Sequence, residues 1–241
     1  MKSVSRLNTS GMGCIIRRQG RRVMLALACC ACAGCATVSS TSESAPLASV
    51  PAEELLFDGV SLSGWTAVGG DAQFRVEDGC IVGTVGPGPN SFLRTERTFG
   101  DFILTLEFRW DLPVNSGVQI RSHQRGGNGR VFGYQCELDP SERAWTGGFY
   151  DEGRRGWLAP LDAETAAHDA ARAAVRLDDW NQVRIEARGP RLRTWVNGVP
   201  CAVLDDRLDG RGFIALQVHS AADGQLRWRD ICLQPLGRAA E

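Results

Sequence analysis

The chain has 241 residues, and its 27 Lys and Arg residues nearly balance 28 Asp and Glu residues, which gives a formal net charge of −1. No basic run interleaved with aromatic residues follows residue 22, so nucleic acid is not expected as a partner. Hydrophobic residues make up 43% of the chain, which suits a globular core and excludes a largely disordered protein.

Residues 1–35 are predicted to be a lipoprotein signal segment. Four arginines between residues 17 and 22 precede an apolar run at 23–33, which is much shorter than the ~20 residues of a transmembrane helix. The run ends in CAGC at 32–35. Small residues before a cysteine are typical of lipoprotein cleavage sites, so we expect Cys35 to carry lipid. A plain secretory signal cleaved nearby is the alternative.

Residues 36–52 are rich in Ser, Thr, Ala and Pro, and such a composition cannot bury enough apolar surface to offset the entropy of ordering. We expect a flexible tether here, followed by one domain over residues 53–241. The protein is then an exported, periplasmic or cell-surface lipoprotein that meets the membrane through its lipid anchor only. The domain has four cysteines, with no close pair of the kind that zinc sites use. The sequence allows these cysteines to form disulfides or to be buried free thiols.

Alternation of apolar and polar residues dominates the domain. It is seen at 103–109, 116–121, 183–188, 192–196, 213–219 and 226–233, and Asn197-Gly198 is a strong hairpin signal. Many short strands separated by turns predict an all-β sandwich or jelly roll. The Ala-rich residues 162–177 predict one short surface helix, with His168 solvated on it. Five tryptophans are expected in the core: Trp65, Trp110, Trp180, Trp195 and Trp228.

One predicted strand carries an unusual polar face. Gln135, Glu137 and Asp139 alternate with apolar residues, so they share one face at ~6.6 Å spacing. A solvent-facing sheet surface is the alternative, but such a surface favours Thr, Lys and Arg over acids and amides. Two other strands present further polar pairs, Gln119 with Arg121 and Gln217 with His219.

If these strands are neighbours, one surface gathers the donors and acceptors that sugar hydroxyls need. Tyr150 and Trp157 lie in predicted loops, where their rings would form an apolar platform at the rim. This combination favours a carbohydrate as the partner. The residues expected on this surface are Arg121, Gln135, Glu137, Asp139, Gln217 and His219.

Several segments resemble a known family in their order along the chain. They are LFDGVSLSGW at 56–65, NSGVQIR at 115–121, the Gly133-Tyr134 pair with Asp139, TGGFY at 146–150, Trp180-Asn181, Asn197-Gly198 and LQVH at 216–219. The chain resembles the bacterial 3-keto-disaccharide hydrolases, also described as 3-keto-α-glucoside-1,2-lyase/3-keto-2-hydroxy-glucal hydratases. The resemblance covers essentially the whole domain and implies a concanavalin A-like jelly roll. Family members usually have Glu-x-Gln after the Gly-Tyr pair, whereas this chain has Gln135-x-Glu137.

The resemblance implies cleavage by proton removal at C2, elimination of the glycosidic oxygen and hydration of the glucal. Such chemistry needs a base, a group that stabilises the enolate and an acid for the leaving group. We hypothesise Glu137 or Asp139 as the base and His219 as acid/base partner or enolate donor. Arg121 would bind substrate, and Gln135 and Gln217 would orient hydroxyls.

A divalent cation held by Glu137, Asp139 and His219 is a further hypothesis, although no ligand spacing in the sequence requires a metal. A non-catalytic carbohydrate-binding lipoprotein is the main alternative function, because the jelly roll serves lectins as well as enzymes. A structural envelope protein is a third interpretation.

Overall fold

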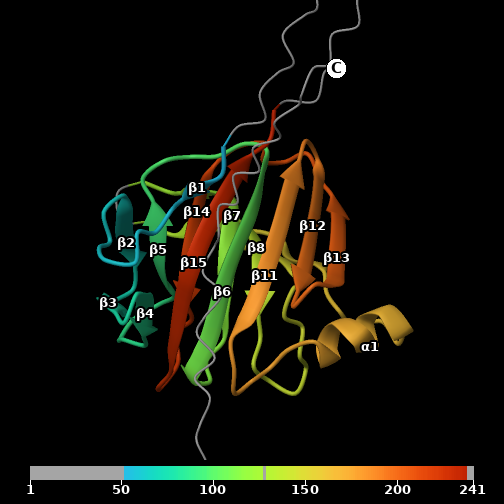
Figure 1. Cartoon of the computed structure of the whole chain (residues 1–241), viewed down its shortest axis with the longest axis horizontal. Helices are drawn as coiled ribbons and strands as arrows, with labels where there is room; N and C mark the ends of the chain where they lie inside the picture. Colours follow the sequence, from blue (N-terminus) through green and yellow to red (C-terminus); the bar gives the residue numbers. More distant parts are fainter. Residues whose placement is uncertain (1–51, 127–128, 238–241) are drawn as a thin grey trace, which may run out of the picture. The chain divides into compact units, whose positions relative to one another are not determined.

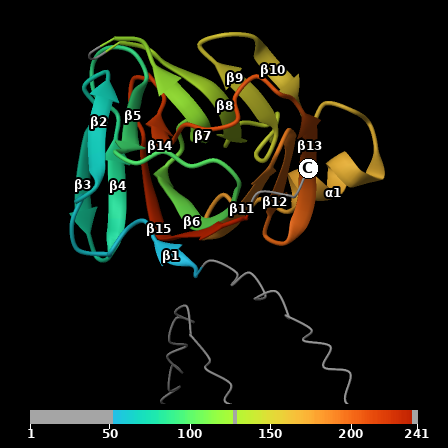
Figure 2. The same ribbon diagram turned by 90° about the horizontal axis from the view of Figure 1, so that it is seen from above.

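The computed structural model describes residues 52–126 and 129–237. The predicted signal segment, Cys35 and nearly all of the predicted tether lie outside these residues. The described chain forms two antiparallel sheets packed face to face, with one helix at the side (Figure 1, Figure 2). This confirms the predicted all-β sandwich. No helix within the described ranges is long and apolar enough to cross a bilayer.

The first sheet has eight strands. Its order is β13 (Val199–Asp205), β12 (Arg191–Val196), β11 (Asn181–Arg188), β6 (Phe102–Leu112), β15 (Gln225–Pro235), β4 (Cys80–Thr84) and β3 (Gln73–Glu77), with β1 (Glu54–Leu55) paired to β15. Asn197-Gly198 forms the tight turn between β12 and β13, and Asn197 has the positive φ of 50° that such a turn requires.

The second sheet has seven strands. Its order is β10 (Gly156–Ala159), β9 (Phe149–Glu152), β8 (Val131–Leu138), β7 (Ser116–Gln124), β14 (Phe213–Val218), β5 (Ser91–Thr95) and β2 (Trp65–Gly69). Strands β7, β8 and β14 lie side by side at its centre, so the segments with the polar alternation are neighbours.

The core lies between the sheets and is built by the period-two pattern. One buried cluster holds residues of both sheets, among them Leu106 and Phe108 of β6, Tyr134 and Leu138 of β8, and Trp228 of β15. Full burial of each such side chain contributes about 1.5–3 kcal/mol relative to exposure. Because these strands bury one face against the opposite sheet, their alternate residues point outward.

Helix α1 (Ala166–Ala173) confirms the predicted surface helix, although it is shorter than the Ala-rich segment. It begins where the Thr165 side chain accepts a hydrogen bond from the His168 backbone N–H at 3.2 Å. His168 Nδ1 in turn accepts from Ala163 N at 3.1 Å, so this histidine ties the helix start to the segment before it. The helix lies beside β13 (Figure 2).

Two of the five tryptophans expected in the core are not buried. Trp65, Trp110 and Trp228 are in the core, but Trp180 and Trp195 lie partly exposed on the outer face of the eight-stranded sheet. Arginine side chains stack on both rings: Arg184 is 4.2 Å from the Trp195 ring centre, and Arg229 is 3.9 Å from that of Trp180. Stacked cations cover these rings in place of core packing.

Candidate functional site

The outer face of the seven-stranded sheet carries a patch of amides and carboxylates. Gln217 on β14 and Glu137 on β8 both pair with Gly117 on β7, so the three residues form one row across the sheet. In the next row, Gln119 on β7 pairs with Gln135 on β8. The structure therefore brings together three residues that the alternation placed on one face: Gln135, Glu137 and Gln217.

A directed hydrogen-bond chain runs along this patch. Ser122 Oγ donates to Gln119 Oε1 at 2.7 Å, and Gln119 Nε2 donates to Gln135 Oε1 at 2.5 Å. Gln135 Nε2 then donates to Glu137 Oε2 at 2.8 Å. The other carboxylate oxygen, Oε1, accepts from Asn115 Nδ2 at 2.6 Å. Every donor points toward Glu137, which fixes the orientation of both glutamines and of the carboxylate.

A glycine makes room for this chain. Gly117 lies directly between Gln217 and Glu137 in the row, and an added Cβ there would lie 2.3 Å from Gln135 Cδ. Real side-chain contacts are never this short, so only glycine lets the Gln135 side chain lie across β7. The NSG segment of the sequence therefore has a packing role in the site.

Glu137 has the properties of a general base. Its residue is 4% exposed. Burial raises the pKa of Glu137, and the bonds from Asn115 and Gln135, which favour the charged form, offset this only in part. Arg143 Nη2 lies 3.6 Å from Oε1. A buried carboxylate with a raised pKa accepts protons more readily than a solvated one, which suits proton abstraction near neutral pH.

Asp139 differs sharply from Glu137, although the two are neighbours along the chain. Its carboxylate accepts bonds from Ser141 N and Oγ, from Arg143 Nε at 2.8 Å and from Trp145 N at 3.2 Å. Burial alone would raise the pKa of Asp139, but the bonds from Ser141 and Arg143 outweigh it and the pKa is lowered. Asp139 therefore holds the loop after β8, and its arrangement does not suit the hypothesised role of base.

An aromatic rim borders the carboxylates. Trp157 meets Trp145 edge to face at 4.8 Å between ring centres and meets Tyr150 at 5.2 Å. The Arg143 guanidinium lies 4.7 Å from the Trp145 ring and 5.0 Å from the Trp157 ring. Tyr150 and Trp157 are partly exposed beside Gln135 and Glu137, so they can contact a ligand on this face.

The expectation that Arg121 shares this surface is wrong. A bulge in β7 gives Arg121 a positive φ of 46° and shifts the register between Ile120 and His123. The side chain therefore leaves the outer face and is fully buried. Its guanidinium donates to the carbonyls of Gly100 and Gly189 and to Asp101 Oδ1, and these bonds hold it away from the outer face. Arg143 is the cation that borders the site.

Glu152 is a site residue that the sequence analysis missed. It belongs to β9, its side chain is 7% exposed, and Gln217 Nε2 approaches Glu152 Oε2 at 3.5 Å. Strands β8 and β7 lie between β9 and β14, which places those strands about 14 Å apart in a flat sheet. Side chains meeting across that span require the face to be hollow along this line. The only sequence signal was its position two residues after Tyr150, which places both side chains on the same face of a strand.

His219 follows β14 and lies at the edge of the same face. Its Nδ1 is 2.9 Å from Ser220 O, and because a carbonyl only accepts, Nδ1 carries the hydrogen in this contact. In the neutral ring Nε2 is then an acceptor. The His219 backbone N–H donates to Asn115 O at 3.3 Å, which links it to the residue that holds Glu137.

The residues present do not fit the hypothesised divalent cation. Both Asp139 oxygens already accept protein donors, and Glu137 Oε1 and Oε2 accept from amides. Within residues 52–126 and 129–237, no three His, Cys, Asp or Glu side chains converge as ligands.

The sequence match with known families covers most of the chain. Residues 52–234 match the model of the 3-keto-alpha-glucoside-1,2-lyase-like domain. A comparison with curated protein sequences finds no match.

Solved structures share the fold at low identity. A galectin-like protein of unknown function from Bacillus subtilis has a TM-score of 0.56 at 15% identity, covering 74% of this chain and 92% of its own. A carbohydrate-binding module from the same species has a TM-score of 0.51 at 15% identity, covering 71% and 95%. A glycosidic hydrolase has a TM-score of 0.52 at 14% identity, covering 81% and 100%. These likenesses establish the sandwich fold alone.

Proposed function

The chain belongs to the family of 3-keto-alpha-glucoside-1,2-lyase-like domains, and on this premise we propose that it cleaves 3-keto-glycosides by elimination followed by hydration. The substrate is a glycoside whose sugar carries a ketone at C3. The ketone acidifies the hydrogen on C2, so cleavage needs a well-placed base and no oxocarbenium ion.

Glu137 is the base in this proposal. Its carboxylate takes the C2 proton, and the electrons of the C2–H bond form the C2=C3 double bond of an enolate. The enolate reforms the C3 carbonyl while C1=C2 forms and the C1–O bond breaks, and the leaving oxygen takes up a proton. Water then adds across C1=C2, with its hydroxyl on C1 and a proton on C2, to give the free 3-keto sugar.

Other residues bind and orient the sugar. Arg143, held against Trp145 and Trp157, supplies positive charge beside Glu137 and takes the role first assigned to Arg121. Tyr150 and Trp157 offer ring faces and edges to the apolar side of the sugar. Gln217 orients hydroxyl groups through its amide.

The observation that carries the proposal is the environment of Glu137. This carboxylate is buried on an outward, polar face, it is oriented by two amide donors, and its pKa is raised. A structural carboxylate would instead be paired as Asp139 is, with a lowered pKa. Paired carboxylates across a cleft, as ordinary glycosidases use, are not needed for this reaction.

The test is cleavage of 3-keto-trehalose and methyl 3-keto-glucoside by the wild-type domain and by Glu137→Gln. We expect the substitution to lower kcat by about 10²–10⁴, the usual contribution of a general base, while the melting midpoint changes little. The double variant Gln135→Glu/Glu137→Gln restores the family order on the same strand face. We expect it to recover part of the lost activity, because an amide-to-carboxylate bond is retained.

A non-catalytic carbohydrate-binding protein is the alternative that this test addresses. Saturable binding of the same sugars without any release of product by the wild type would favour that function. We also propose export and lipid attachment at Cys35, supported by the arginines, apolar run and CAGC sequence of residues 1–35. The membrane would then be met through the anchor only.

A further inference from the structure

Glu152 has fewer strong partners than the other buried acids of the site. Its contacts are 3.5 Å to Gln217 Nε2 and 3.8 Å to Arg130 Nη2, with a bond from Asn90 and with His219 nearby. Glu137, by contrast, has amide donors at 2.6 Å and 2.8 Å. The Arg130 side chain is 68% exposed, so water screens its charge. Little in the protein therefore compensates Glu152 for the loss of water.

The weak compensation affects the proton affinity of Glu152. Burial is the largest influence on the pKa of Glu152 and raises it, whereas Arg130 and His219 lower it by less. A neutral carboxyl group has one O–H to donate.

Gln217 carries a second sign of a missing ligand. The residue is fully buried, yet its Oε1 accepts no hydrogen bond from the described chain. An unpaired buried oxygen costs about 1–3 kcal/mol, so such atoms persist mainly where a ligand or water completes them. Once protonated, Glu152 offers a donor beside the unused acceptor of Gln217, and a sugar presents both an ether oxygen and hydroxyl hydrogens.

We infer that Glu152 is the general acid that protonates the departing glycosidic oxygen and that Gln217 Oε1 accepts a hydroxyl of the departing unit. This assignment rests on the proposed function and divides the reaction between two carboxyl groups of one face. Glu137 on β8 removes the C2 proton, and Glu152 on β9 serves the leaving group.

Both carboxyl groups regain their starting protonation states over the two half-reactions. In elimination, Glu137 gains the C2 proton and Glu152 gives its O–H proton to the oxygen leaving C1. In hydration, the Glu152 carboxylate takes a proton from the water whose hydroxyl bonds to C1. The electrons of C1=C2 shift to give the enolate, and Glu137 returns its proton to C2. Both residues end as they began.

His219 lies at the edge of this pair. Its Nδ1 hydrogen is engaged by Ser220 O, which leaves only Nε2 for a ligand. It can accept a sugar hydroxyl at the edge of the site.

Leaving-group dependence tests the inference. We expect Glu152→Gln to lower kcat/KM for methyl 3-keto-glucoside by about 10²-fold or more, because a methoxide leaving group needs an acid. With p-nitrophenyl 3-keto-glucoside, whose phenolate leaves unprotonated, we expect a loss of less than about threefold. The variant should still exchange the C2 hydrogen of the free 3-keto sugar for deuterium, as followed by NMR, whereas Glu137→Gln should not.

Glu164→Gln is the matched control, since Glu164 is exposed ahead of α1, and it should leave all three rates unchanged. Melting curves establish that each variant is folded. Glu152→Asp provides a second variant, which keeps the carboxyl group but moves it back from the ligand by one methylene group. Equal losses for both glycosides, or no loss for either, would overturn the role of Glu152 while leaving the proposed function intact. A wild-type domain that cleaves neither glycoside would instead overturn the proposed function and the inference with it.

Discussion

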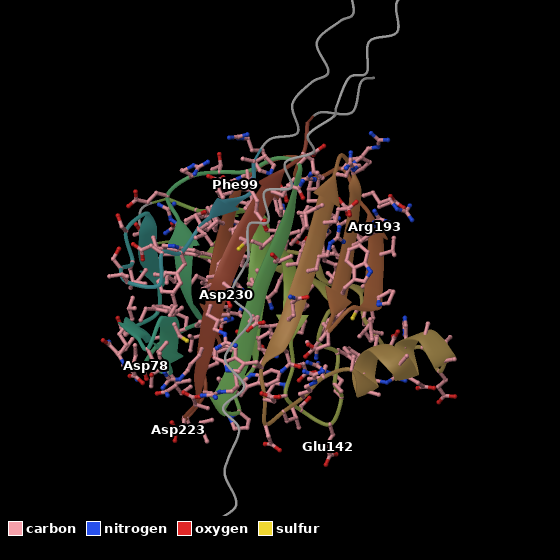
Figure 3. The ribbon with its side chains drawn as sticks, in the orientation of Figure 1. Asp78, Phe99, Glu142, Arg193, Asp223 and Asp230 are labelled. Atoms are coloured by element: carbon pink, nitrogen blue, oxygen red, sulfur yellow. The ribbon has the colours of Figure 1, made fainter. Side chains whose placement is uncertain are left out.

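The outer faces of the two sheets are both rich in charged groups, but they handle their acids in opposite ways. On the eight-stranded sheet, Glu107 pairs with Arg229 at 2.7 Å, and Arg193, labelled in Figure 3, pairs with Glu186. Arginine pairing there outweighs desolvation and lowers the pKa of Glu186. On the seven-stranded sheet, burial raises the pKa of both Glu137 and Glu152.

The difference teaches that acid content alone does not mark a site. Glu107 and Glu186 on the eight-stranded sheet already have arginine partners, so they have little to gain from a ligand. Glu137 and Glu152 on the seven-stranded sheet are buried near amides, and one neighbouring amide oxygen, Gln217 Oε1, has no partner among the described residues. Such groups can form hydrogen bonds with a ligand that they do not form within the protein.

Asp139 breaks the simple division, because it borders the site but is paired like the acids of the other sheet. We expect Asp139→Asn to destabilise the domain by about 3 kcal/mol, since it removes a buried carboxylate that accepts bonds from Ser141 and Arg143. The melting midpoint near neutral pH should fall by roughly 6–12 °C.

The pH dependence of this loss provides a second check. Because the pKa of Asp139 is lowered from 3.8 by folding, its stabilisation is complete above that value and disappears as the pH falls through the folded value. The difference in melting midpoint between wild type and Asp139→Asn should therefore become smaller in acid. A difference that stayed constant down to pH 2 would show that the charge of Asp139 contributes nothing to stability.

Gln217→Leu sharpens the comparison on the seven-stranded face. Removal of the unpaired buried oxygen should stabilise the domain by about 1 kcal/mol, which raises the melting midpoint by roughly 2–4 °C. The same variant should bind sugar at least about tenfold more weakly, because a hydroxyl partner is lost. Calorimetry measures both effects. A fall in the midpoint would mean that Gln217 is structural.

Glu107→Gln tests the eight-stranded face with the chemical change used at Glu137. Its pair with Arg229 is partly exposed, and surface pairs contribute little. We expect the melting midpoint to move by less than about 2 °C and the cleavage rate to stay within error. A clear loss of activity would show that the eight-stranded face takes part in binding.

The sequence was informative wherever strands are regular. Alternation was sufficient to place Gln135, Glu137 and Gln217 on one face, since a strand has no freedom to turn a side chain to the wrong side without a bulge. Arg121 was misplaced for that reason: the bulge that reverses it leaves no mark in the residue pattern. The close approach of Gly212 to the Arg121 backbone, where an added Cβ would lie 2.2 Å from its carbonyl carbon, is visible only in the structure.

Glu152 was missed because its role depends on sheet curvature. The segment FYDE of β9 shows no regular alternation of apolar and polar residues, and only the folded sheet brings the Glu152 side chain toward Gln217. Trp180 and Trp195 were misassigned for a related reason, since composition favours burial of tryptophan but stacking arginines allow it to remain at the surface.

The hydrogen-bond chain from Ser122 to Glu137 also makes the site electrically asymmetric. Its hydroxyl and two amides all have their positive ends toward Glu137, so their dipoles add at the carboxylate. When Glu137 takes up a proton, its negative charge no longer attracts the aligned dipoles. A proton on Oε2 would also compete with the hydrogen that the Gln135 amide donates to that oxygen. The array therefore favours the carboxylate and opposes the effect of burial, so it lowers the cost of returning the proton to carbon before the next turnover.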